Sequence, residues 1–283
     1  MSRAPASFDL VVATVGRTEE VRRLLDSLEA QRYVSARVLV VDQNRDGRLD
    51  AVLSGRDLDI VRLESAPGLS RARNVGLARV AADIVAFPDD DCEYPPGLLA
   101  RVAERLDADP ALDGLAGRAE NVDGRSSASW KLDVAQLTDD NLWNRANAAT
   151  IFLRGSLIQR IGIFDERLGL GSDEPWSSGE ETDYLIRAVR AGARIEYDPS
   201  LIVLHDVRAD DEHIGARDGA SVGYLLRKHR YPPRVVARMT VRPVGGALAA
   251  AVRLDLPGVR YYISTLLGRV RGYLGASRSK SAA

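Results

Sequence analysis

Short, continuously apolar runs recur through the first 90 residues of the chain, separated by stretches with helical periodicity. The four runs, each long enough for a strand and too short for a helix, lie at residues 8–13, 37–41, 60–63 and 84–87. The stretches between them predict helices over residues 18–30 and 70–82, with Thr18 and Ser70 at their starts. Strands that alternate with helices predict a doubly wound, mostly parallel α/β sheet, and continuously apolar strands agree because parallel strands are buried on both faces.

The rest of the chain is less regular and ends in helices. Residues 180–191 have the apolar spacing of a helix that Gly192 would end, whereas residues 126–144 are polar and predict a loop or cover. Further strands are expected at residues 112–119, 150–153 and 201–204. We therefore predict three parts, which are a catalytic α/β domain at residues 1–206, a basic helical extension at 207–275 and a disordered tail at 276–283.

Composition limits the setting of the protein. Apolar residues make up 45% of the 283 residues, which suits a globular core. Cys92 is the single cysteine, so a disulfide framework is excluded and a reducing compartment is the simplest assumption. Residues 1–7 lack the apolar segment of a signal peptide, and the longest apolar stretch, residues 244–252, is shorter than the roughly 18 residues of a membrane span. These features predict a cytoplasmic protein with no membrane-spanning segment.

Charge is distributed unevenly along the chain. The net charge of −1 hides twelve Lys or Arg and a single acid, Asp255, from Arg227 onward, which gives +11 there and leaves −12 for residues 1–226. The basic part also contains an amphipathic pattern at residues 256–274, and a basic amphipathic helix can lie on an anionic membrane. We predict that the C-terminal helices hold the protein on the inner face of the membrane, the alternative being that they only pack on the catalytic domain. The apolar positions are Val259, Ile263, Leu266, Leu267, Val270 and Leu274.

Three adjacent aspartates, Asp89, Asp90 and Asp91, follow the apolar run at residues 84–87 after one proline. Adjacent like charges repel one another, and a hard divalent cation such as Mg²⁺ or Mn²⁺ removes the repulsion. The carboxyl end of a strand is also where open α/β sheets bind their ligands. The triplet is therefore a candidate metal site, with a solvated acidic turn as the alternative.

Seven blocks of sequence, in order, resemble glycosyltransferase family 2. They are VVATVGRTEEVRRLLDSL, VLVVDQN, GLSRARNVGLA, IVAFPDDDC, GIFDERLGLG, SGEETDYLIRAVRAG and LIVLH, and they cover roughly residues 8–206. The resemblance implies the GT-A fold and transfer of a sugar from a nucleotide-sugar donor to an acceptor, usually with inversion of the anomeric centre.

The resemblance also implies a nucleotide-sugar site assembled from several blocks. Asp42 would contact the nucleoside, with a turn aspartate as the alternative, and the sequence DQN at this point leaves the base open. Residues 68–74 (GLSRARN) open a helix whose N-terminus and arginines favour a diphosphate. The residues expected to bind the donor are Thr14, Val15, Arg17, Asp42, Arg71, Arg73, Asn74, Asp89 and Asp90.

The acidic triplet resembles the DxD motif of the family, with Asp89 and Asp91 as its two acids and Asp90 leaving the register ambiguous. One carboxylate would bind the metal, and the other would bind the sugar, the ribose or a metal-bound water. His205, at a later strand end, matches a position that often completes the metal or diphosphate site, and imidazole is an acceptable ligand for Mn²⁺. The resemblance thus implies Mn²⁺ or Mg²⁺ held by Asp91, Asp89 and His205.

A second acidic cluster opens the helix expected at residues 180–191. The position of the catalytic base holds Glu181, where relatives commonly have Asp, and this departure leaves Glu180 and Asp183 as alternatives. Asp183 could instead cap the helix or pair with Arg187, one turn further on. Trp176, in the stretch before the cluster, is expected either to stack on an acceptor sugar or to anchor its loop.

These observations predict a metal-dependent inverting glycosyltransferase of bacterial polysaccharide or glycolipid synthesis. Its partners would be a nucleotide-sugar and a hydroxyl acceptor, with a lipid-linked acceptor favoured by the basic tail, and no nucleic acid. A sugar-phosphate nucleotidyltransferase is one alternative, but residues 13–16 (ATVG) do not supply its Gly-rich triphosphate signature. A non-catalytic nucleotide-binding homologue is the other, and it would lack the acids that are present here.

Overall fold

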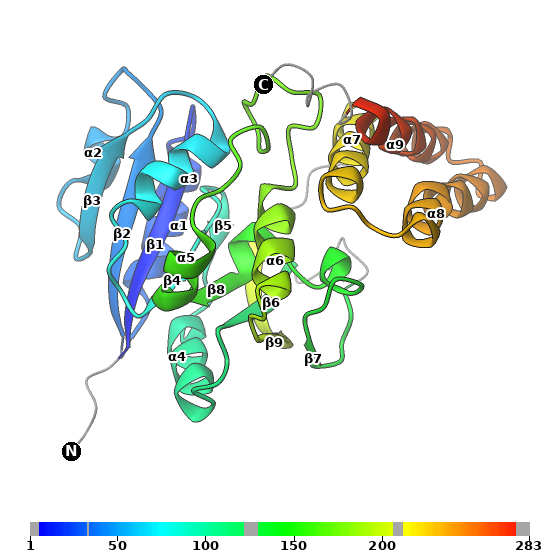
Figure 1. Ribbon diagram of the computed structural model, residues 1–283. Coiled ribbons are helices and arrows are strands. Elements are labelled where there is room, and N and C mark those ends of the chain that lie inside the picture. The colour runs from blue at the N-terminus through cyan, green and yellow to red at the C-terminus, as the bar shows by residue number, and fades with distance from the viewer. Residues whose placement is uncertain (1–5, 33, 122–129, 206–211, 276–283) are drawn as a thin grey trace. The chain divides into compact units, whose positions relative to one another are not determined.

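The computed structural model describes residues 6–32, 34–121, 130–205 and 212–275, which form two compact units (Figure 1). The first unit extends to Phe164 and resumes from Tyr184 to the end of the sheet. The second unit joins residues 165–183 to the helices that follow residue 211. The predicted division at residue 206 therefore needs one change, because the segment 165–183 belongs with the C-terminal helices. The tail predicted at residues 276–283 lies outside the described residues.

The first unit is built on one nine-stranded sheet in the order β3-β2-β1-β4-β8-β6-β9-β5, with β7 paired to β9 (Figure 1). Its strands are β1 (Ser7–Thr14), β2 (Ser35–Asp42), β3 (Asp59–Glu64), β4 (Ile84–Ala86), β5 (Cys92–Glu93), β6 (Gly114–Glu120), β7 (Ala135–Gln136), β8 (Ile151–Arg154) and β9 (Ile195–His205). All the predicted strands are present, and each except β9 lies within a residue or two of its expected ends, whereas β9 begins at Ile195 rather than at residue 201.

The sheet is parallel in its first half and mixed beyond it. Strands β3, β2, β1 and β4 run parallel to one another, as the continuously apolar runs predict. Strand β8 then enters antiparallel to both β4 and β6, and β9 runs parallel to β6. The two inversions restore the original direction, so β9 and β4 end at the same edge of the sheet.

Helices cover both faces of the parallel half, and the alternation of side chains along β1 shows which helix covers which face. Phe8, Leu10 and Val12 pack with the apolar residues of α1 (Glu19–Glu29) and α4 (Leu98–Ala108). Val11 points to the opposite face, where α3 (Leu69–Leu77) approaches so closely that a β-carbon on Gly76 would clash with it. Successive residues of a strand face opposite sides, so this one strand is buried by both helical layers.

Of the two predicted helix starts, the start of α1 agrees with the structure and the start of α3 does not. Thr18 precedes α1 as predicted, although its side chain makes no capping hydrogen bond. The prediction that Ser70 caps α3 is wrong, because the helix begins at Leu69 and Gly68 precedes it with φ 130°. A backbone at positive φ favours glycine, which explains why the Pro67-Gly68 break directly precedes the helix.

The irregular middle of the chain adds short elements to the first unit. Residues 122–129, within or next to the predicted cover, lie outside the described residues, and the remainder of the cover contains β7 and a 3-10 helix at Leu142–Asn144. The remaining short elements are α2 (Asp50–Leu53), the 3-10 helix Ala148–Thr150 and α5 (Gly155–Ile161). Helix α6 (Glu180–Arg190) matches the helix expected at residues 180–191, and the boundary between the units falls within it.

The second unit contains α7 (Glu212–Lys228), α8 (Pro233–Val252) and α9 (Leu256–Gly275). The glycines at positions 215, 219 and 223 recur every four residues, so they lie on one face of α7. A β-carbon on Gly219 would clash with the backbone carbonyl of Thr265 in α9, and the face of α9 that carries Gly268 and Gly272 approaches α7 equally closely. The two helices therefore approach one another at backbone distance at Gly219, Gly268 and Gly272, where a larger side chain would not fit.

Helix α8 corrects one prediction from the sequence. No stretch was expected to reach the length of a membrane span, yet among the described helices α8 has the length and hydropathy for one, and 17% of its most apolar window is buried in the protein. Pro243 and two glycines interrupt the apolar pattern in the sequence, but the helix continues through them.

The α7–α9 contact predicts a matched pair of stability effects. Gly219→Ala should lower the free energy of unfolding by about 1–3 kcal/mol, because the added methyl forces two backbones apart. Gly245→Ala should be neutral or stabilising by up to about 1 kcal/mol, because its β-carbon meets nothing within 4 Å and alanine favours a helix. Urea unfolding followed by circular dichroism measures both, and equal effects of the two substitutions would contradict the close contact.

Candidate functional site

Side chains that could bind a ligand or a metal lie where strands of the sheet end. Strand β1 ends at Thr14 and β2 at Asp42, and the acidic triplet follows β4 after Phe87 and Pro88. Strand β9 ends at His205, whose backbone pairs with Cys92 in β5, directly after the triplet. The topology thus brings His205 to the aspartates although more than a hundred residues separate them.

Arg17 binds two members of the triplet. Its guanidinium pairs with Asp90 and lies 2.7 Å from Asp91 Oδ2. Burial raises the pKa of Asp90, while Arg17 opposes the rise. Burial would in turn lower the pKa of Arg17, but Asp90 and Asp91 raise it, so Arg17 stays cationic. Arg17 therefore supplies the positive charge that the triplet needs.

Two further basic side chains contact the outer aspartates. Arg73, on α3, is 1% exposed and donates from Nη2 to Asp89 Oδ1 at 3.0 Å. His205 Nε2 lies 3.1 Å from Asp91 Oδ1 and 3.9 Å from Asp89 Oδ2. Burial by itself lowers the pKa of His205, but the hydrogen bond to Asp91 and the two nearby carboxylates outweigh it, so the pKa is raised. Arg17, Arg73 and His205 thus contact the triplet from three distant segments.

The donor set suits a hard divalent cation in chemical type. Two carboxylates and one imidazole, from Asp89, Asp91 and His205, converge within 4 Å, and Mn²⁺ accepts both ligand types. In the part of the chain that the structure describes, however, no three His, Cys, Asp or Glu side chains are already grouped around a metal position. The carboxylates are instead arranged as ion pairs with Arg17, Arg73 and His205.

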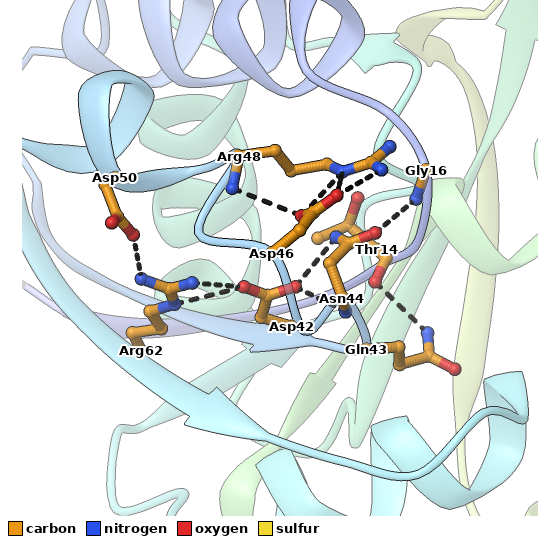
Figure 2. A network of polar contacts seen from close by, with 9 residues as sticks. All are labelled: Thr14, Gly16, Asp42, Gln43, Asn44, Asp46, Arg48, Asp50 and Arg62. Carbon is orange, nitrogen blue, oxygen red and sulfur yellow. Dashed lines mark hydrogen bonds and ion pairs between the residues drawn. The ribbon is translucent and has the colours of Figure 1, made fainter.

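The turn after β2 contains a network of hydrogen bonds and ion pairs centred on Asp42 (Figure 2). Asp42 is 2% exposed, and its Oδ2 accepts from Arg62 Nε at 3.0 Å and Nη2 at 2.6 Å. Its Oδ1 accepts from the backbone and side-chain nitrogens of Asn44, both at 2.8 Å. Both carboxylate oxygens are therefore engaged within the protein, which is the arrangement expected of the alternative reading, a turn aspartate.

The same turn ties the neighbouring loops together. Asn44 Oδ1 accepts from the backbone of Gly16 at 2.7 Å, and Gln43 Oε1 accepts from the backbone of Gly68 at 2.8 Å. The side chain of Gln43 donates from Nε2 to the carbonyl oxygen of Thr14 at 3.4 Å (Figure 2), and its backbone nitrogen donates to the same oxygen at 3.0 Å. The DQN residues thereby fix the loop after β1 and the start of α3. Gln43, Asn44 and Arg62 have no role that the sequence pattern predicts, and only their nearness to Asp42 along the chain or across the sheet could have indicated one.

The remaining residues expected to bind the donor have different surroundings. Thr14 is buried, whereas Val15 is 55% exposed at the edge. Arg71 is exposed and donates to the carbonyl of Pro67 at 3.1 Å. Asn74 exchanges two hydrogen bonds with the backbone of Phe164, at 2.8 and 3.1 Å, so it anchors the loop before residue 165. Of the two arginines in α3, Arg73 approaches the acidic triplet and Arg71 faces solvent.

The second acidic cluster lies in the first turn of α6, in the second unit. Glu180 is 4% exposed, while Glu181 is partly exposed and accepts a hydrogen bond from Thr182. Asp183 is fully buried, and its Oδ1 lies 2.5 Å from Lys228 Nζ and 2.8 Å from His229 Nε2. The cluster therefore holds one solvent-accessible carboxylate, Glu181, and one carboxylate committed to buried ion pairs.

Trp176 lies in the same unit and is 5% exposed. Its indole stacks on Tyr224, with ring centroids 4.5 Å apart and planes 11° from parallel. This is the geometry of the loop anchor that the sequence left as the alternative to acceptor stacking.

The sheet order and the similarity to solved structures show an α/β protein of the GT-A fold. The family model of glycosyl transferase family 2 matches residues 9–159, which are 151 of the 283 residues. The chain belongs to this family, as the seven sequence blocks predicted.

Relatives and solved structures agree with this assignment. A pre-mycofactocin glycosyltransferase of Mycobacterium tuberculosis is 30% identical over 278 residues, covering 92% of this chain and 54% of the relative. Glycosyltransferase AglE of Haloferax volcanii is 24% identical over 237 residues, covering 77% and 69%. The chain spans about half the length of the first of these relatives.

Two solved structures show the fold. The mannosyltransferase PcManGT of Pyrobaculum calidifontis, in complex with GDP-Man and Mn²⁺, has a TM-score of 0.67 at 17% identity, over 96% of this chain and 88% of its own. S. aureus TarS 1-349, in complex with UDP-GlcNAc, has a TM-score of 0.61 at 18% identity, over 95% and 92%.

Proposed function

We propose that the chain transfers a sugar from a nucleotide-sugar donor to a hydroxyl acceptor, with inversion of the anomeric centre and with the help of Mn²⁺ or Mg²⁺. The observation that carries the proposal is the convergence of Asp89, Asp91 and His205 at the carboxyl edge of the sheet in a member of glycosyltransferase family 2. Polysaccharide or glycolipid synthesis is the setting that we favour.

In this proposal the donor diphosphate exchanges places with protein ion pairs. Asp91, Asp89 and His205 would hold the metal, which would offset the charge of the leaving diphosphate. Arg17, released from Asp91, would then be free to contact a phosphate oxygen, while Arg73 keeps Asp89 in place. The GDP-Man and Mn²⁺ bound to PcManGT, and the UDP-GlcNAc bound to TarS, support this class of donor for the fold.

We assign removal of the acceptor proton to Glu181. A general base must reach the proton that it takes, and Glu181 is the accessible acid of the first turn of α6. Asp183 is a weaker candidate, because its carboxylate is buried and paired with Lys228 and His229. The acceptor oxygen would attack the anomeric carbon as the bond to the diphosphate breaks, which gives inversion in one displacement.

The first prediction concerns donor binding and metal. In thermal-shift and calorimetric titrations with UDP-GlcNAc and GDP-mannose, Mn²⁺ should be required for tight binding of one donor, and EDTA should abolish it. Asp91→Asn should weaken that binding by about tenfold or more, since contacts to charged groups contribute about 1.5–3 kcal/mol. Asp107→Asn, which changes an exposed acid on α4, is the matched control. Undiminished binding and release of nucleoside diphosphate in EDTA would contradict the metal assignment, and release of pyrophosphate would indicate a nucleotidyltransferase.

The second prediction concerns the base. Glu181→Gln should lower kcat for release of nucleoside diphosphate by about 10²-fold, while the donor Kd changes little, because a base acts on the chemical step. Glu180→Gln is the neighbouring control. Loss of kcat in Glu180→Gln with full kcat in Glu181→Gln would move the base by one residue.

We also propose that the second unit binds an anionic membrane surface. Four residues recur along one side of α8 and are 41–85% exposed, namely Val241, Val244, Leu248 and Val252. Exposed arginines at 234, 238 and 242 lie beside them, and Leu254 between α8 and α9 is 86% exposed. An apolar stripe beside basic residues has the chemistry of a helix that lies in the lipid headgroup region. This surface supports attachment to the inner face of the membrane and a lipid-linked acceptor.

The third prediction tests this surface. The full chain should sediment with liposomes that contain anionic lipid, and binding should fall steeply with salt, because each basic residue near the surface contributes about 1 kcal/mol. Changing Arg234, Arg238 and Arg242 to Glu should abolish the binding. The matched control changes three exposed arginines of the first unit, Arg23, Arg101 and Arg160, to Glu. Equal binding to neutral and anionic liposomes, unaffected by salt, would leave the helices as a packing element.

A further inference from the structure

One face of α7 holds the segment that leads into the acidic turn of α6. Asp218, Ser221, Leu225 and Lys228 are spaced by three, four and three residues, so they share one side of the helix. All of them contact residues between 178 and 183 in the second unit. These four residues of α7 therefore contact the chain segment that leads to Glu180 and Glu181.

The segment is fixed at its start by hydroxyl groups. Ser178 donates from Oγ to Asp218 at 2.9 Å, and its backbone donates to Ser221 Oγ at 3.1 Å. Gly179 follows with φ 78°, and a β-carbon there would lie 3.2 Å from Leu225 Cδ1. The chain therefore turns into α6 while in close contact with α7, at a position where positive φ favours glycine.

The segment is fixed at its end by ion pairs. Lys228 Nζ lies 2.5 Å from Asp183 Oδ1 and 2.7 Å from Asp165 Oδ2, so one ammonium joins two carboxylates. His229 Nε2 lies 2.8 Å from the same oxygen of Asp183. An ionised carboxylate only accepts hydrogen bonds, so His229 carries its proton on Nε2.

The burial of Asp183 makes these pairs a constraint on the backbone. A fully buried carboxylate is tolerated only with charge partners and hydrogen bonds, so Asp183 cannot leave Lys228 and His229 without a large penalty. The backbone nitrogen of Asp183 also donates to Gly179 at 2.9 Å, closing the turn that contains Glu180 and Glu181. The position of the two glutamates is thus set by α7.

We propose that Lys228 and His229 are positioning residues for the catalytic base, acting through Asp183 on the first turn of α6. The inference rests on the proposed function only in taking Glu181 as the base. It gives the basic C-terminal unit a role in catalysis that is separate from contact with a membrane.

The test combines Lys228→Met with Glu181→Gln in a double-mutant cycle on the full chain. The readouts are kcat for release of nucleoside diphosphate and donor Kd, with UDP-GlcNAc or GDP-mannose as the donor, whichever gives the tighter binding. Lys228→Met alone should lower kcat by about tenfold or more and leave Kd within about twofold, since a small displacement of a reacting group is costly. In the Glu181→Gln background the same change should have little further effect, because the base is already lost.

Controls separate positioning from loss of structure. Arg227→Met removes the neighbouring charge, whose guanidinium lies over Tyr273, and should keep kcat. Lys228→Arg should restore part of the activity. If Lys228→Met does not fold, His229→Ala takes its place in the cycle, with His229→Gln as its conservative partner. Hydrogen exchange should rise in the peptide that covers residues 178–184 and stay unchanged in β1 and α3.

The kinetic results distinguish failure of the positioning role of Lys228 from failure of the assignment of Glu181 as the base. A normal kcat in Lys228→Met, or an equal fall with and without Glu181, overturns the positioning role while the base assignment stands. A normal kcat in Glu181→Gln overturns the base assignment, and with it the route by which Lys228 would act. A kcat that falls in Lys228→Met only together with a weakened donor Kd also overturns the positioning role.

Discussion

Charge neutralisation at the strand ends is the constraint on which the rest of the structure depends. Buried or crowded carboxylates are stable only beside cationic groups, and each partner comes from a distant segment. Arg73 reaches Asp89 from α3, and Arg62 reaches Asp42 from β3. These pairs hold the loops of the sheet edge in register before any ligand arrives. Under the proposed function, an anionic donor and its cation would bind by exchanging partners with these ion pairs.

The parallel half of the sheet could be predicted from the sequence because its strands are buried on both faces and therefore read as unbroken apolar runs. Strand β9 was longer than expected, since residues 195–200 alternate between apolar and polar and include Pro199. The start of α3 was misplaced by a serine that resembles a cap, whereas the backbone geometry of Gly68 decides where the helix begins. The local sequence pattern therefore predicted the positions of the elements more accurately than their first and last residues.

The sequence predicted that the candidate residues Asp89, Asp91 and His205 lie at strand ends, and the structure brings them near one another there. It was not predictable where a side chain has a partner across a large sequence distance. Asp183 could be expected to pair with Arg187 one turn away, yet Lys228 and His229, more than forty residues further on, contact it. That residues 165–183 belong with the C-terminal helices could not be predicted for the same reason. Contacts between residues far apart in the chain leave no periodic pattern in the sequence.

The pairing of Asp183 with residues 228 and 229 has a consequence for protein synthesis. The ribosome makes every described strand of the sheet before Lys228. The strand ends that carry Asp42 and the acidic triplet can therefore form on a nascent chain whose turn at the start of α6 has not yet met Lys228 and His229. Under the proposed function, such a nascent chain could hold a nucleotide-sugar before its base is positioned, so donor binding would precede sugar transfer during synthesis.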